Sequence, residues 1–116
     1  MTIPAIVITG AARTPVVKYL GALRDITPAE LAAQVLIAAA TRSKIDPKNV
    51  DDVILGQAYQ NGENVNIARM ALLPADWPVE IPGVTIDRRC LSGIAAVCMG
   101  AMKIQSGQGD VVVAGG

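Results

Sequence analysis

The residue best suited to chemistry is Cys90, which opens the uncharged run from Cys90 to Met102. The β-branched stretch Val84–Ile86 and the polar turn Asp87-Arg88-Arg89 come just before it. This order predicts a strand, a tight turn and a buried helix that is apolar on all sides. We therefore expect Cys90 at a helix N-terminus, where unpaired N–H groups and the helix dipole favour a thiolate nucleophile.

Cysteine also has a purely structural role to consider. A free cysteine often behaves as a small buried hydrophobe, so on position alone both roles of Cys90 stay open. Cys98 lies in the middle of the predicted helix among apolar neighbours, and we expect it to pack in the core. A disulfide between Cys90 and Cys98 is not expected, because eight helical residues separate them by about 12 Å, beyond the roughly 7 Å limit for bridging.

Few other side chains offer chemistry. The chain has no histidine, which excludes histidine metal sites and a Cys–His pair within the chain, and we expect no metal. Arg88 and Arg89 would raise the local positive potential for a thiolate or an acidic substrate, although plain surface exposure is the simpler account. Asp51 and Asp52 precede an apolar run and are predicted to form a solvated turn.

Alternating strands and helices must position Cys90. Apolar β-branched runs predict strands at 5–10, 53–56, 84–87 and 110–116, with Tyr59 as a candidate extension of the second. Helical spacing predicts helices from Pro28 to about Lys44, at 67–73 and at 91–106, and Thr27 with Glu30 forms a capping box for the first. This alternation favours an α/β domain with a largely parallel sheet, in which sites form at the carboxyl ends of strands.

Composition narrows the class of function. Of 116 residues, 52% are hydrophobic and 17% are charged, and the formal net charge is zero. Without a basic block or many aromatic residues, nucleic-acid binding is not expected. No signal peptide or run of roughly 20 apolar residues is found, so no membrane partner is expected, and two thiols suit a reducing compartment. We therefore expect a cytoplasmic protein.

Taken together, several motifs give the chain a strong family resemblance. In chain order they are Ala11-Ala12-Arg13-Thr14-Pro15, Asp51–Gly56, Asn66-Ile67-Ala68-Arg69, Cys90-Leu91-Ser92-Gly93 and Asp110–Gly116. Over nearly its whole length the chain resembles the N-terminal half-domain of the thiolases, the acetyl-CoA acetyltransferases and 3-ketoacyl-CoA thiolases. The C-x-S-G motif that begins at Cys90 is similar to the nucleophile motif of that family.

The resemblance implies a fold and a reaction. The fold would be a thiolase-like layered α/β/α half-domain with a mostly parallel mixed sheet, truncated, so that residues 1–116 lack the loop domain and the C-terminal half. Cys90 would attack an acyl-CoA thioester, and the acyl-enzyme would pass its acyl group to coenzyme A or to an acetyl-CoA carbanion. The backbone N–H of Cys90 would help to hold the oxyanion. No cofactor is implied beyond the coenzyme A thioester that serves as substrate, and no coenzyme A-binding residue is assigned.

Two departures from the family pattern bear on activity. Asp87 stands where asparagine is common, and its carboxylate would oppose a thiolate at Cys90 unless Arg88 or Arg89 pairs with it. In the family, the activating histidine, a second catalytic cysteine and an oxyanion-hole asparagine lie in the C-terminal half. We therefore expect no turnover by the chain alone, and we expect a homo-oligomer or a partner that supplies the C-terminal half.

Two alternative functions stay open. A related condensing enzyme, such as a ketoacyl synthase or a hydroxymethylglutaryl-CoA synthase, also uses a cysteine, although the C-x-S-G motif favours a thiolase. A non-catalytic thiolase-like binding or scaffold module would use the apolar helix for association. The lack of histidine supports this second alternative, whereas the intact nucleophile motif opposes it.

Overall fold

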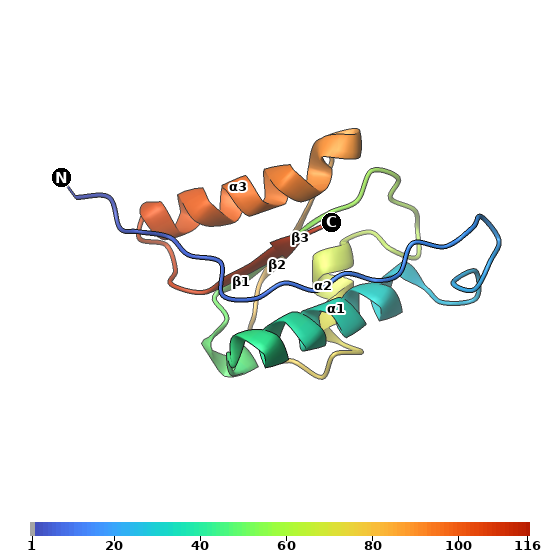
Figure 1. Ribbon diagram of the computed structural model, residues 1–116, viewed down its shortest axis with the longest axis horizontal. Helices are drawn as coiled ribbons and strands as arrows, with labels where there is room; N and C mark the ends of the chain where they lie inside the picture. The colour runs from blue at the N-terminus through green and yellow to red at the C-terminus, as the bar shows by residue number, and fades with distance from the viewer. Residues whose placement is uncertain (1) are drawn as a thin grey trace.

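The computed structural model describes residues 2–116, which form an open three-stranded sheet and three α-helices. The strands are β1 (Asp52–Gly56), β2 (Gly83–Ile86) and β3 (Val112–Gly115), and the helices are α1 (Pro28–Ser43), α2 (Ile67–Leu72) and α3 (Ser92–Gln105). Helix α3 covers one face of the sheet, whereas α2 covers the other face with α1 packed against it (Figure 1). The predicted α/β class and layered α/β/α arrangement are confirmed.

Strand β1 is the centre of the sheet. The strand order is β2-β1-β3, and both neighbours run parallel to β1, so that Val53 is in register with Gly83 and Val113. Val53 and Ile54 are buried on opposite faces, as expected for a strand covered by helices on both sides. The carboxyl ends of all three strands therefore meet at one edge, which is the edge from which the chain leaves β2 toward Cys90.

Helix α1 begins as its sequence predicts. The Thr27 backbone N–H donates to Glu30 Oε2 at 2.8 Å, and the Glu30 N–H donates to Thr27 Oγ1 at 3.2 Å, which completes the capping box. The helix ends where Lys44 takes a left-handed conformation. Its buried stripe packs with α2 and β1 in the main core, whose largest fully buried side chains are Leu36, Leu72 and Val53. This half of the molecule is scaffold.

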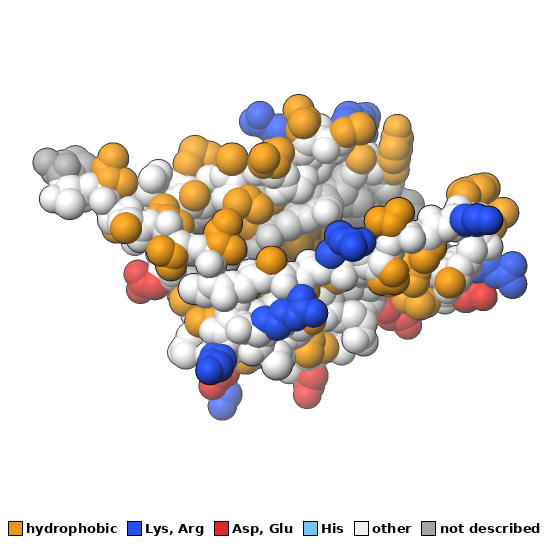
Figure 2. Space-filling view, viewed as in Figure 1, with side chains coloured by type: hydrophobic (Ala, Val, Ile, Leu, Met, Phe, Trp, Pro, Cys, Tyr) orange, Lys and Arg blue, Asp and Glu red, His pale blue; other side chains and the backbone are white. Residues whose placement is uncertain are grey.

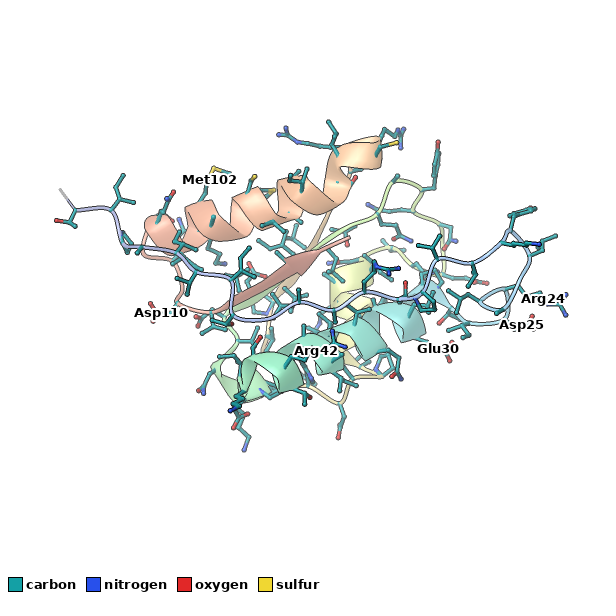
Figure 3. The ribbon with its side chains drawn as sticks, viewed as in Figure 1. Arg24, Asp25, Glu30, Arg42, Met102 and Asp110 are labelled. Atoms are coloured by element: carbon teal, nitrogen blue, oxygen red, sulfur yellow. The ribbon has the colours of Figure 1, made fainter. Side chains whose placement is uncertain are left out.

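The predicted strand at residues 5–10 is wrong, because this segment pairs with no other strand in residues 2–116. It runs as an extended chain beside α1, where Arg42 Nη1 donates to the carbonyl of Ala11 at 2.7 Å (Figure 3). Ile3, Val7 and Ile8 are exposed. β-Branched composition marks a segment that can become a strand, but a strand also needs a partner edge, which composition does not specify. Likewise β1 ends at Gly56 and does not extend to Tyr59.

Helix α3 buries only the stripe that faces the sheet. That stripe contains Ser92, Ala96 and Gly100, and small residues there let the helix approach β3 closely. The predicted burial on all sides is wrong, because Leu91, Ile94 and Met102 are between 57% and 66% exposed. Hydrophobic side chains are therefore visible along α3 (Figure 2), and Met102 points away from the sheet (Figure 3). None of the helices in residues 2–116 has the length and apolarity needed to cross a membrane.

Candidate functional site

Cys90 lies in the short connection between β2 and α3. β2 ends at Ile86, one turn of 3-10 helix spans Arg89–Leu91, and α3 begins at Ser92. The thiol of Cys90 is free and exposed. The sequence-based placement at a helix start, beyond the carboxyl end of a strand, agrees with the structure. The alternative role of Cys90 as a small buried hydrophobe does not, because its side chain is not buried.

The turn that carries Cys90 is closed by the hydroxyl of Ser92. The Arg88 N–H donates to Ser92 Oγ at 2.8 Å, and Ser92 Oγ–H donates to the Arg89 carbonyl at 2.7 Å. Ser92 is only 5% exposed. Arg89, between these partners, has a φ of +51°, in the left-handed region that residues other than glycine rarely occupy. The two hydrogen bonds of the Ser92 hydroxyl therefore flank a residue with an unusual backbone conformation next to the thiol.

The carboxyl end of β1 makes room for this turn. Gly56 ends β1, and a Cβ added to it would lie 2.5 Å from the Cβ of Ser92. A side chain at position 56 would therefore displace the first turn of α3. Gly116 follows β3 and also lies close to Gly56, because a Cβ added to Gly116 would meet the Gly56 backbone at 2.9 Å. Glycine at these two strand ends lets the backbone of the nucleophile turn rest directly on the sheet.

The charges next to Cys90 are paired with each other. Asp87 Oδ2 lies 2.7 Å from Arg89 Nη1, and Asp87 Oδ1 accepts the Arg89 N–H at 2.9 Å. Arg89 Nη1 also donates to the Ala58 carbonyl at 2.5 Å, and the guanidinium lies 5.2 Å from the ring centroid of Tyr59. Asp87 was expected to oppose a thiolate unless Arg88 or Arg89 pairs with it, and Arg89 makes that pair. Because the Arg89 side chain is 65% exposed, this pair orients the turn more than it stabilises the fold.

Asp51 and Asp52 do not form the solvated turn that the sequence suggests. Asp52 is buried, and its Oδ2 accepts a hydrogen bond from Lys103 Nζ of α3 at 2.7 Å. Asp51 stays exposed, but its Oδ2 accepts the backbone N–H groups of Val111 and Asp110, which lowers the pKa of the Asp51 carboxyl. Both carboxylates therefore tie β1 to its neighbours. The sequence hid these roles because their partners lie more than fifty residues away in the chain.

Cys98 also departs from expectation. It was predicted to pack in the core, but it is exposed and free on the outer side of α3. A run of apolar residues does not indicate which helix face meets the sheet, and the buried stripe here is formed by smaller residues. No group of three or more potential metal ligands occurs among residues 2–116. Among the hollows of residues 2–116, two open ones have volumes of about 390 and 400 Å³, and neither is lined by Cys90.

Ser92, Tyr59 and the conformation of Arg89 are the features of the site that sequence reasoning missed. In the sequence, Ser92 stands out only as part of the C-x-S-G motif. Its spacing from Cys90 was the one available signal, since a serine in the first helical turn commonly bonds the preceding backbone. Tyr59 gave no signal, because the loop that carries it approaches Arg89 only in the folded chain.

Comparisons with known proteins match this chain to thiolases and acetyl-CoA acetyltransferases. A family model described as the N-terminal domain of thiolase matches residues 6–116. The steroid 3-ketoacyl-CoA thiolase FadA6 of Mycobacterium tuberculosis is 48% identical over 107 residues, which cover 91% of this chain and 26% of that protein. An acetyl-CoA acetyltransferase of Cupriavidus necator is 42% identical over 111 residues, which cover 96% of this chain and 28% of that protein.

This chain is also similar to a solved structure. The crystal structure of the Bacillus anthracis acetyl-CoA acetyltransferase superposes with a TM-score of 0.92 at 47% sequence identity. The match covers 95% of this chain and 28% of that one. The chain therefore spans little more than a quarter of the length of the proteins it matches.

Proposed function

The chain belongs to the thiolase family, and from this premise we propose that it is the nucleophile-bearing part of an acyl-CoA acyltransferase in which Cys90 is the catalytic residue. One observation carries the proposal. A free, exposed thiol lies at the start of α3, within a C-x-S-G sequence, just beyond the carboxyl end of a parallel strand. That position suits a nucleophile, whereas a cysteine with a purely structural role would be expected to be buried.

The first step of the reaction is acyl transfer to sulfur. The Cys90 thiolate attacks the carbonyl carbon of an acyl-CoA thioester, and the π electron pair of the C=O bond moves onto oxygen. The oxyanion then collapses, the C=O bond re-forms, and the bond to the coenzyme A sulfur breaks, so that coenzyme A leaves as a thiolate. The acyl group remains on Cys90 until a second coenzyme A thiolate or an acetyl-CoA carbanion accepts it.

The backbone next to Cys90 suits this step. The Cys90 N–H donates to no acceptor within residues 2–116, so it is available to the oxyanion, and the fourteen-residue helix α3 directs its positive end toward the same place. The Asp87 carboxylate, which would oppose a thiolate, is paired with Arg89. With no histidine in the chain, we propose that the proton acceptor and the second-step base come from residues outside it.

The test is covalent labelling by acetyl-CoA at about pH 9, where an ordinary thiol is largely ionised. We expect the chain to gain one acetyl group per molecule, located on Cys90 by peptide mass spectrometry, without steady release of product. Cys98→Ala is the matched control and should be acetylated like the parent chain. Equal acetylation of Cys90→Ala, or acetylation of Cys98 alone, would refute Cys90 as the nucleophile.

A second candidate function is association without catalysis. It is favoured by the apolar outer face of α3, which is exposed in the structure, and by the lack of histidine. A scaffold would bind its partner equally well after Cys90→Ala, whereas acyl transfer would be lost. The relatives described above are named as thiolases and acetyl-CoA acetyltransferases, which favours a thiolase over a ketoacyl or hydroxymethylglutaryl-CoA synthase.

A further inference from the structure

We propose that Ser92 is a positioning residue for the acyl transfer, because its hydroxyl fixes the peptide group whose N–H receives the oxyanion. This inference rests on the proposed function and deepens it. Ser92 itself is buried against Gly56 and is not offered as a group that touches substrate. Its influence would pass entirely through the backbone between Arg88 and Cys90.

The hydrogen bonds of the turn single out one N–H group. Among residues 88–92, the Arg88 N–H donates to Ser92 Oγ, and the Arg89 N–H donates to Asp87 Oδ1. The N–H groups of Leu91 and Ser92 donate to the carbonyls of Arg88 and Arg89. Only the Cys90 N–H in this turn has no acceptor within residues 2–116. Every backbone N–H group of residues 88–92 therefore has an acceptor except the one adjacent to the thiol.

The hydroxyl of Ser92 controls the direction of that free N–H. The Arg89 carbonyl and the Cys90 N–H belong to the same planar trans peptide and point in opposite directions. Ser92 Oγ–H and the Ser92 N–H both donate to the Arg89 carbonyl, which fixes one end of this plane. The Cys90 N–H must then point away from Ser92, whose side chain faces the sheet.

The conformation that results would not persist unaided. Arg89 has a φ of +51°, and a residue with a Cβ is disfavoured there unless its surroundings hold it. The bonds from Arg88 to Ser92 and from Ser92 to Arg89 lie on either side of this strained residue. Gly56 leaves no room for Ser92 to shift toward the sheet. Removing the hydroxyl should therefore leave the peptide held only by the backbone N–H of residue 92, so that it moves more while the helix stays in place.

The decisive comparison is between two reactions of Cys90 in Ser92→Ala. Acylation by acetyl-CoA develops an oxyanion, whereas alkylation by iodoacetamide does not. We expect Ser92→Ala to slow acetylation about tenfold more than alkylation, since loss of a whole oxyanion donor costs about 100- to 1,000-fold. Equal slowing of both reactions, or no slowing of either, would overturn the proposal and leave Ser92 as an ordinary structural residue.

Ser106→Ala is the matched control. Ser106 Oγ–H donates to the Lys103 carbonyl three residues earlier at 2.9 Å, the same pattern that Ser92 makes with Arg89, but at the far end of α3. Its replacement should leave the ratio of the two rates unchanged. Circular dichroism of both variants checks that α3 remains folded, and alanine beside Gly56 takes no more space than serine.

A second measurement keeps the inference separate from the proposed function. The backbone ¹⁵N order parameter of the Cys90 amide should fall from about 0.85, typical of rigid backbone, to below about 0.6 in Ser92→Ala. If the parent chain takes up no acetyl group, the proposed function fails, but this measurement still decides whether Ser92 holds the peptide. An order parameter that stays high in Ser92→Ala would overturn the inference even if Cys90 is acetylated.

Discussion

At the scale of single residues, the pair formed by Asp87 and Arg89 controls the charge next to Cys90. Arg89→Ala leaves the Asp87 carboxylate unpaired, and a carboxylate near a thiol disfavours the thiolate. We expect alkylation of Cys90 by iodoacetamide to slow about threefold, a modest effect because the site is exposed to water and salt. The double variant Asp87→Asn/Arg89→Ala should recover most of the parent rate.

Arg88→Ala is the control for this prediction and should slow alkylation less, because Arg88 forms no ion pair with Asp87 in residues 2–116. Failure of the double variant to recover would show that Arg89 acts other than through Asp87.

Some features of this site can be predicted from the sequence and others cannot, depending on whether the residues involved are neighbours in the chain. The position of Cys90 and the pairing of Asp87 with Arg89 involve neighbours in the chain, which spacing can predict. The φ of Arg89 gave no signal in the sequence, and the close approach of the turn to Gly56 joins it to a strand more than thirty residues away. Cys98 was misplaced because an uncharged helix gives no indication of which face is covered.

At the scale of elements, Asp51 joins the start of β1 to the start of β3. Its Oδ2 accepts two backbone N–H groups at 2.7 and 3.0 Å, and these bonds lower the pKa of the carboxyl from its ordinary value of 3.8. A lowered folded-state pKa means that the stabilisation is complete above 3.8 and is lost as the pH falls through the folded value. We expect Asp51→Asn to lower the unfolding midpoint in urea titrations at neutral pH, with the deficit shrinking as the pH falls below 3.8. Asp110→Asn, at an exposed neighbouring aspartate whose side chain accepts no hydrogen bond in residues 2–116, is the control. A constant deficit at every pH would exclude the carboxylate as the cause.

The elements themselves show what local sequence can predict. The start of helix α1 follows from the sequence because the capping bonds join Thr27 and Glu30, three residues apart, with Pro28 at the first helical position. Strands β1, β2 and β3 and helix α2 were also found, each within a few residues. The segment at 5–10 has the same composition as these strands, yet it is unpaired. The difference lies in pairing, a property of two segments that one segment cannot reveal.

At the scale of the whole molecule, the main question is how the chain tolerates an apolar outer surface. Leu91, Ile94 and Met102 lie exposed along or beside α3, and the apolar side chains of the N-terminal segment are exposed as well. Isolated apolar residues on a surface are ordinary, but a continuous row along one helix marks an interaction surface. The main core is buried on the opposite face of the sheet, so the exposed apolar row on α3 is the surface at which we expect association.

We therefore expect the chain to self-associate at micromolar concentration, and light scattering should report a mass above that of the monomer. Ile94→Lys places a charge on the outer face of α3, where desolvating it would oppose association, and should shift the population toward monomer. Val79→Lys is the matched control, because Val79 is 62% exposed in the connector before β2, away from α3. Val79→Lys should leave the mass unchanged.

A parent chain that is monomeric at these concentrations would contradict the prediction. An equal fall in mass for both lysine variants would place the contact elsewhere than on α3. If Ile94→Lys yields a folded monomer that is still acetylated on Cys90, association and the reactivity of Cys90 are separable, even though both residues lie near the N-terminal end of α3.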